Sequence, residues 1–197
     1  KYDAVKRCTS EGFECEKMAI EKIKHFISKD ALNIDGLGKK VIEKFWDLNF
    51  IRLPQDIFKL NYNKIETLDG WGKLSVANLR YAIDQSKKIS LEKLIFSLGI
   101  RHIGQENAKL IAGCFGSVQK FKNLLDFKKK DENLENLNSI DGIGEIQIKS
   151  IDLFCSNKKN TEVTNELIKE LKIDDHKIVS SNSKLSGKTL MFTGTLN

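Results

Sequence analysis

The stretch IDGLGKK at residues 34–40 decides the fold, because close copies of it return along the chain. Two copies read LDGWGKL at 68–74 and IDGIGEI at 140–146, and a looser copy, IRHIGQE, lies at 100–106. The second glycine of the copies falls at Gly38, Gly72, Gly104 and Gly144. Their spacing of 32 to 40 residues indicates one supersecondary unit that is used four times.

The glycines in each copy predict a tight turn that leads into a helix. Gly-x-Gly permits positive φ without steric cost and removes side chains that would keep a ligand from the main chain. The amides of such a turn and of the following helix start point outward together, which makes an anion site. The middle residue is apolar and is expected to anchor the turn between its helices: Leu37, Trp71, Ile103 and Ile143. For Trp71, a contact with a sugar is the alternative.

The copies differ in the charges beside the glycines. Lys39 and Lys73 follow the second glycine in copies one and two, where each lysine can add a charge-assisted contact to phosphate. Copy three has His102 in place of the first glycine and Arg101 beside it. Arg101 is expected to reach a phosphate or the minor groove. His102 is a candidate DNA contact, and the alternative is a structural histidine that bonds a backbone carbonyl. Glu145 in copy four would repel phosphate, so we expect this copy to bind weakly or to serve packing.

A single Gly-x-Gly is usually an ordinary tight turn, but four copies placed between predicted helices favour the helix–hairpin–helix, a unit that binds the DNA backbone. Contacts with the DNA backbone carry little sequence information, because phosphates are the same at every base pair. Four hairpins on one side of a duplex would lie across the minor groove. The expected DNA contacts are Gly36, Leu37, Gly38, Lys39, Gly70, Trp71, Gly72, Lys73, Arg101, His102, Gly104, Gly142 and Gly144.

Composition agrees with a helical protein that binds a polyanion. The 197 residues carry a net charge of +6, and 40% of them are hydrophobic, which suffices for one or two packed domains. No apolar run reaches the roughly 18 residues of a membrane span, and no signal peptide is expected. The cysteines do not form a close-spaced disulfide framework, so a reducing compartment is expected, with Cys114 and Cys155 buried. Since no methionine starts the chain, we expect a piece of a longer protein.

Apolar periodicity predicts helices over most of the chain. Their expected ranges are 17–28, 39–48, 55–60, 75–87, 90–98, 105–115, 117–127, 133–138, 145–155 and 161–171. The charged run at 128–132 is interpreted as a solvated connection, and 174–184 as a linker. Residues 185–197 then resemble the start of a β-strand.

Several longer stretches resemble the bacterial NAD-dependent DNA ligase family. They are AVKRC at 4–8, HFISKDALNIDGLGKKVIEKF at 25–45, SLGIRHIGQENAKLIAGCFGS at 97–117 and GKTLMFTGTL at 187–196. The resemblance implies a mostly α fold: a tandem helix–hairpin–helix DNA-binding domain with four hairpins, a partial zinc finger before it and a truncated BRCT strand after it. The implied ranges are 1–16 for the zinc-finger segment, 17–173 for the helix–hairpin–helix domain, 174–184 for the linker and 185–197 for the BRCT strand.

The same resemblance implies the chemistry of the parent protein. Such ligases join 3′-hydroxyl and 5′-phosphate ends at nicks in duplex DNA during replication and repair, with NAD, Mg²⁺ and zinc as cofactors. Zinc would be held by Cys8 and Cys15 together with two ligands upstream of the chain; six residues separate this pair where the family is expected to have five. The adenylated lysine sits in a Lys-x-Asp-Gly motif, which KYDA at 1–4 does not match. We therefore expect no catalytic residue, no sealing by this chain alone, a monomer, a cytoplasmic location and nicked double-stranded DNA as the partner.

Two other interpretations remain open. The chain is alternatively a stand-alone helix–hairpin–helix module of a repair or recombination protein, or a purely structural helical domain whose glycines only serve turns. A salt-dependent affinity for duplex DNA would exclude the structural domain. A Lys-x-Asp-Gly motif upstream would distinguish the ligase from the stand-alone module.

Overall fold

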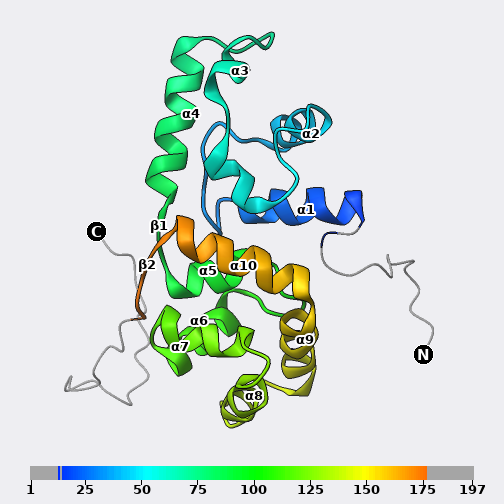
Figure 1. The fold of residues 1–197 in the computed structure, drawn as a ribbon. Coiled ribbons are helices and arrows are strands. Elements are labelled where there is room, and N and C mark those ends of the chain that lie inside the picture. Colours follow the sequence, from blue (N-terminus) through cyan, green and yellow to red (C-terminus); the bar gives the residue numbers. More distant parts are fainter. Residues whose placement is uncertain (1–12, 14, 177–197) are drawn as a thin grey trace, which may run out of the picture.

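The computed structural model describes residue 13 and residues 15–176, which form a mostly helical, elongated molecule (Figure 1). The elements up to the middle of the chain are α1 (Glu16–Phe26), α2 (Lys39–Asp47), the 3₁₀ helix η1 (Pro54–Lys59), α3 (Tyr62–Glu66), α4 (Lys73–Ser86) and β1 (Lys88–Ser90). They are followed by α5 (Leu91–Ser97), α6 (Gln105–Phe115), α7 (Val118–Phe121), the 3₁₀ helix η2 (Lys122–Leu125), α8 (Lys130–Asn138), α9 (Glu145–Ser156), α10 (Lys158–Glu170) and β2 (Lys172–Asp174). Residues 1–12 and 14 of the expected zinc-finger segment 1–16, all of the expected segment 185–197 and most of the expected linker 174–184 lie outside the described residues.

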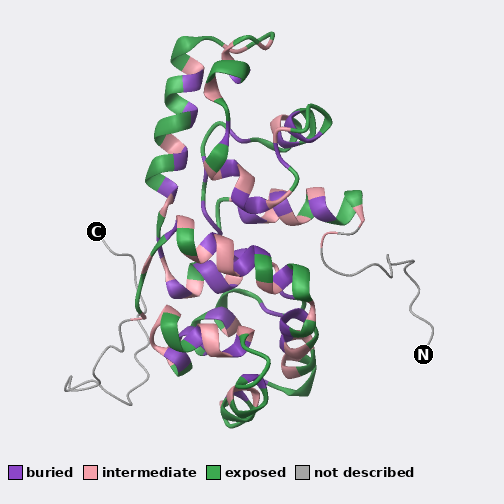
Figure 2. Cartoon of the chain, in the orientation of Figure 1, coloured by how far each residue is buried: buried purple, intermediate pink, exposed green. Residues whose placement is uncertain are grey.

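The helices form two groups that share one apolar core. Figure 1 shows α1 to α4 in the upper part, α5 to α9 in the lower part, and α10 running between them. Helix α10 packs on η1 from the upper group and on α9 from the lower one. The largest fully buried side chains come from both groups, among them Phe26, Phe45, Ile65, Leu94 and Phe121. Exposed residues gather on the outer faces of the helices, as on α4 in Figure 2.

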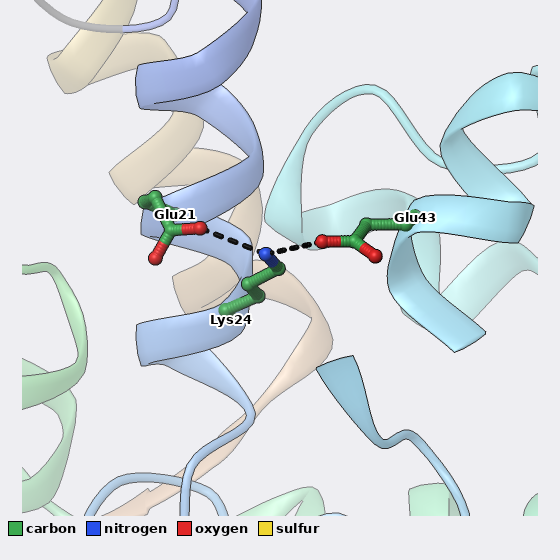
Figure 3. A network of polar contacts seen from close by, with 3 residues as sticks. All are labelled: Glu21, Lys24 and Glu43. Atoms are coloured by element: carbon green, nitrogen blue, oxygen red, sulfur yellow. Dashed lines mark hydrogen bonds and ion pairs between the residues drawn. The ribbon is translucent and has the colours of Figure 1, made fainter. Parts of the chain in front are cut away.

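Polar contacts fix the angle between α1 and α2. Lys24 Nζ donates to Glu21 Oε1 at 2.8 Å on its own helix and to Glu43 Oε1 at 2.7 Å on α2 (Figure 3). The hydrogen bond from Lys24 lowers the pKa of the Glu43 carboxyl. Trp46 Nε1 on α2 also donates to Glu16 Oε1 at the start of α1, at 2.9 Å. The two helices on either side of the first glycine copy are therefore held together from both ends.

Most predicted helices are confirmed, but three details of the chain trace differ. Helix α3 was not predicted, because its five residues are too few to show periodicity; its start is fixed by Asn61, whose Oδ1 accepts from the Lys64 amide at 3.2 Å. The helix expected over 117–127 divides into α7 and η2. The helices expected over 133–138 and 161–171 each begin three residues earlier, at Lys130 and Lys158.

The charged run at 128–132, interpreted as a solvated connection, is exposed at four of its five residues, but the interpretation was wrong for Lys130 and for the helix that begins there. Lys130 begins α8 and is only 8% exposed. Its Nζ donates to Asp152 Oδ1 at 2.5 Å and to Ser156 Oγ at 2.7 Å, both on α9. The hydrogen bond to Asp152 raises the pKa of Lys130. A buried lysine is tolerated here because its charge is paired.

Two short strands, which the sequence did not predict, join distant parts of the chain. Strands β1 and β2 are parallel, with Ile89 opposite Ile173, and the amide of Lys172 donates to the carbonyl of Lys87 at 2.7 Å. Asp174, expected as the first residue of a linker, therefore belongs to a strand. Just beyond it, the amide of His176 donates to the carbonyl of Gly116 at 2.8 Å.

Candidate nucleic-acid interface

The four glycine copies form four turns of the same kind, each lying between two helices. Turn one lies between α1 and α2, turn two between α3 and α4, turn three between α5 and α6, and turn four between α8 and α9. In each turn the amide of the middle apolar residue donates to the carbonyl three residues earlier. These bonds run from Leu37 to Ile34 (3.4 Å), Trp71 to Leu68 (3.0 Å), Ile103 to Ile100 (3.1 Å) and Ile143 to Ile140 (3.1 Å).

The first glycine position has positive φ in every turn. The values are +84° at Gly36, +82° at Gly70, +62° at His102 and +92° at Gly142. A turn with positive φ at its third residue favours glycine there because a Cβ is strained in that region. His102 adopts the same conformation although it is not glycine, so turn three keeps the geometry of the others. Its carbonyl accepts a hydrogen bond from Asn107 Nδ2 at 3.2 Å, while the His102 side chain is exposed.

The second glycine position begins the following helix. The carbonyls of these glycines accept the first helical hydrogen bonds, from Ile42 to Gly38, Val76 to Gly72, Ala108 to Gly104 and Ile148 to Gly144, at 2.9 to 3.1 Å. The φ values of Gly38, Gly72 and Gly104 are −71°, −138° and −86°, which any residue adopts. A Cβ built on any of these three glycines would meet no atom of the described chain within 4 Å. Neither backbone strain nor internal packing therefore explains why the chain has glycine there.

The middle residues anchor the turns, as expected. Leu37, Ile103 and Ile143 are buried in the core, and Trp71 is half-buried with its ring centroid 5.6 Å from that of Phe45 on α2. The expected contact of Leu37 with DNA cannot involve its side chain, since that side chain is covered by the protein. The anchor role of Trp71 is supported by this packing.

The four turns alternate in how the second-glycine amide is used. In turn two, the amide of Gly72 donates to Ser75 Oγ at 2.9 Å, and in turn four the amide of Gly144 donates to Gln147 Oε1 at 3.2 Å. Within the described residues, no side chain caps the helix start at Gly38 or Gly104. Turns one and three therefore keep this amide open, while turns two and four cover it with a side chain three residues later.

The turns also lie in two pairs. Gly36 of turn one and Gly70 of turn two line one shallow hollow of about 380 Å³ together with Leu79 of α4. In the other pair, turn four lies against α6: a Cβ on Gly142 would be 3.0 Å from Leu110 Cδ1. Turns one and two thus converge on one site, and turn four packs on the helix that follows turn three.

Exposed basic side chains lie beside the first three turns. Lys39 and Lys73 occupy the first helical positions after turns one and two, and Arg101 lies in turn three. Across the described part of the chain, neither Lys39 nor Lys73 is within ion-pair distance of a carboxylate. In turn four, Glu145 Oε2 is 3.8 Å from Lys149 Nζ, so the acidic residue there has a partner on its own helix.

Sequence reasoning missed part of this surface. Lys40, the second lysine of IDGLGKK, is exposed, as Lys39 is, and Lys44 Nζ donates to the carbonyl of Asp69 in turn two at 3.2 Å. Ser75 and Gln147 were also missed as caps. Their position three residues after the helix-start residue is the signal that would have found them.

The cysteines give no zinc site in the described residues. Cys8 lies outside them, and Cys15 is a half-buried thiol at the residue before α1. A structural zinc ion requires four ligands, and the described part of the chain has no group of three or more His, Cys, Asp or Glu side chains placed to hold a metal ion. Cys155 is buried as expected, and burial raises its pKa to about 12. Cys114, expected to be buried, is instead exposed at a hollow between α6 and α8.

None of the helices described has the length and apolar character that crossing a bilayer requires.

The fold is mostly helical and contains a helix–hairpin–helix motif. The helix-hairpin-helix motif family matches residues 93–164, which include turns three and four. The chain is also 60% identical over 197 residues to a DNA ligase from Pelagibacter ubique (strain HTCC1062), covering all of this chain and 29% of that protein. It is 41% identical over 202 residues to a DNA ligase from Rickettsia bellii (strain OSU 85-389), covering 98% of the chain and 29% of that protein. A DNA ligase from Rhizobium meliloti (strain 1021) is 41% identical over 209 residues, again with 29% of its length covered.

The chain corresponds along its whole length to a segment of these DNA ligases, which confirms the resemblance of its motifs to DNA ligases. It spans less than a third of the length of these relatives.

Proposed function

We propose that this chain is a non-catalytic region of a DNA ligase that grips duplex DNA by its sugar–phosphate backbone. All four turns act as hairpins of helix–hairpin–helix units, and together they lie across the minor groove of nicked DNA. The observation that carries the proposal is the nature of the second glycines. Gly38, Gly72 and Gly104 have ordinary φ and open space around them, so the need for glycine comes from a ligand that approaches the main chain.

Phosphate is the ligand that best fits these positions. Each second glycine begins a helix whose first amides have no main-chain partner in the helix and carry the positive end of its dipole. At Gly72 and Gly144 the glycine amide itself is bonded to a side chain, and the amides that follow it remain for a ligand. Lys39, Lys73 and Arg101 add full positive charges at the same places. The contacts would hold either strand of any sequence, because phosphates are identical along DNA. A region that binds duplex without sequence preference suits an enzyme that must act at breaks anywhere.

The remaining parts of the proposal concern the parent protein. It seals nicks between 3′-hydroxyl and 5′-phosphate ends in DNA replication and repair, as a monomer in the cytoplasm, with NAD and Mg²⁺ supplying the adenylation chemistry outside this chain. Residues 1–16, with Cys8 and Cys15, would be the end of a zinc finger, 17–173 the gripping domain, 174–184 a linker and 185–197 the start of a BRCT domain. This chain alone would bind and orient the duplex and would not seal it.

Salt dependence of binding tests the proposal. Fluorescence anisotropy of a labelled nicked duplex is measured with the 197-residue chain at several salt concentrations. The logarithm of the association constant should fall linearly with the logarithm of salt, with a slope of several units, because each phosphate contact releases condensed cations. No measurable binding at low salt would refute the DNA-gripping function and favour the structural helical domain.

A further inference from the structure

Two large apolar side chains are exposed at the same position of turns two and four. Leu74 is 76% exposed and Ile146 is 62% exposed, and each lies two residues after the second glycine of its turn. At the same position, turns one and three have Lys40 and Glu106. Solvent-exposed leucine and isoleucine are common singly, but here they recur at one site of a repeated unit. The recurrence indicates that the position has a role in these two turns.

The apolar residues occur in the two turns that cover their own amides. The Gly72 amide is bonded to Ser75 Oγ, and the Gly144 amide is bonded to Gln147 Oε1. These two turns therefore present a carbon surface beside an occupied amide, whereas turns one and three present an open amide, with Lys40 in turn one and Glu106 in turn three at the corresponding position. Glu106 Oε1 is 2.7 Å from Lys109 Nζ, so this acidic side chain has a partner on its own helix. The open amides of turns one and three therefore suit phosphates, whereas Leu74 in turn two and Ile146 in turn four suit an apolar surface close to the phosphates.

We propose that Leu74 and Ile146 are apolar DNA contacts that pack on the deoxyribose edges of the minor groove. The inference rests on the proposed function, since it takes duplex DNA as the ligand of the same turns. The walls of the minor groove are lined by sugar carbons, and leucine and isoleucine are among the side chains that DNA-binding proteins place there. A duplex next to turn two also meets the exposed charge of Lys73, which directly precedes Leu74. At turn four, Lys149 lies beside Glu145 at 3.8 Å and reduces its repulsion of phosphate.

The same two helices provide matched controls. Tyr81 on α4 is 67% exposed and Leu153 on α9 is 60% exposed. Tyr81 lies seven residues beyond Leu74, and Leu153 lies seven residues beyond Ile146. Seven residues are about two helical turns, so each control side chain lies on the same helix face about 10 Å further from the turn. Their substitution removes a similar area of exposed apolar surface from the same helices without touching the helix starts.

The test compares two double variants of the 197-residue chain, Leu74→Ala with Ile146→Ala and Tyr81→Ala with Leu153→Ala. Affinity for a labelled nicked duplex is measured by anisotropy at several salt concentrations, and circular dichroism checks that both variants fold. The Leu74→Ala, Ile146→Ala variant should bind about fivefold to tenfold more weakly, with the salt slope of the wild type, because no phosphate contact is removed. The Tyr81→Ala, Leu153→Ala variant should bind like the wild type. The Leu74→Met, Ile146→Met variant should bind like the wild type, since methionine keeps an apolar side chain of similar size at each position.

Three results would overturn the inference: unchanged affinity of the Leu74→Ala, Ile146→Ala variant, an equal loss in the control variant, or a smaller salt slope that reveals lost phosphate contacts. Each leaves the proposed function standing as long as the wild-type chain binds duplex. Failure of the wild-type chain to bind at low salt would instead refute the proposed function itself.

Discussion

Alanine at the open helix-start glycines, Gly38 and Gly104, should weaken DNA binding and leave the stability of the fold nearly unchanged. Gly38 and Gly104 have φ of −71° and −86°, and a Cβ on either would meet nothing within 4 Å. Alanine therefore fits the folded chain. Alanine is less favourable than glycine as a helix cap. It also lowers the conformational entropy of the unfolded chain, which stabilises the fold by roughly 0.4–1 kcal/mol, so the two effects largely cancel. The free energy of unfolding of the Gly38→Ala, Gly104→Ala variant should remain within about 1 kcal/mol of the wild type.

The effect on DNA binding should be much larger. A Cβ at either position would stand where a phosphate must approach the amides of the helix start. Losing one hydrogen bond to a charged group costs about 1.5–3 kcal/mol, and about 1.4 kcal/mol corresponds to a factor of ten in affinity. The double variant should thus bind a nicked duplex at least about tenfold more weakly, as measured by anisotropy at moderate salt.

Alanine at the first glycines provides the opposite control. Gly36 and Gly142 have φ of +84° and +92°, where an L-residue is strained by roughly 1–2 kcal/mol, and the Cβ on Gly142 would be 3.0 Å from Leu110 Cδ1. Gly36→Ala and Gly142→Ala should therefore lower stability in urea denaturation. Stable Gly38→Ala, Gly104→Ala protein with wild-type affinity would refute the reasoning, because these glycines would then have no role outside the fold.

Three further predictions follow from the same geometry. Lys39→Glu with Lys73→Glu should weaken duplex binding by roughly tenfold or more and reduce the salt slope, with unchanged circular dichroism; unchanged affinity would count against this face as the interface. His102→Val should lower the free energy of unfolding by about 1–2 kcal/mol, since a β-branched residue is strained at φ of +62°, whereas His102→Gly should be tolerated; equal stability of the two in urea would contradict the turn geometry. Lys130→Ala should destabilise the chain by about 1 kcal/mol through loss of its hydrogen bonds to α9, and a wild-type urea midpoint would show that this buried pair contributes nothing.

Much of the helical layout could be predicted because helical periodicity is a local signal. Helix α6 occupies the predicted 105–115, since its apolar residues recur along one face and glycines flank it on both sides. The positive φ of the first glycines was also predictable, because only glycine adopts it without strain. His102 shows the limit of that rule: the turn keeps its shape there through the hydrogen bonds around it.

Features that depend on distant partners were missed. The burial of Lys130 requires Asp152 on another helix, and β1 forms only because Lys172–Asp174 returns to it from much later in the chain. Cys114 was expected to be buried because its sequence neighbours are apolar, but it lines the hollow between α6 and α8 and is exposed there. In the candidate interface, the turns were predictable, while their arrangement in two pairs depends on tertiary packing.

The chemical shifts of the helix-start glycine amides test the central claim most directly. The claim is that main-chain N–H groups of the turns face the DNA backbone. In a titration of the ¹⁵N-labelled chain with nicked duplex, the amide resonances of Gly38 and Gly104 should shift most, and those of Gly72 and Gly144, which already have side-chain partners, should shift less. Saturation with DNA that leaves all four resonances in place, while signals elsewhere move, would contradict the account.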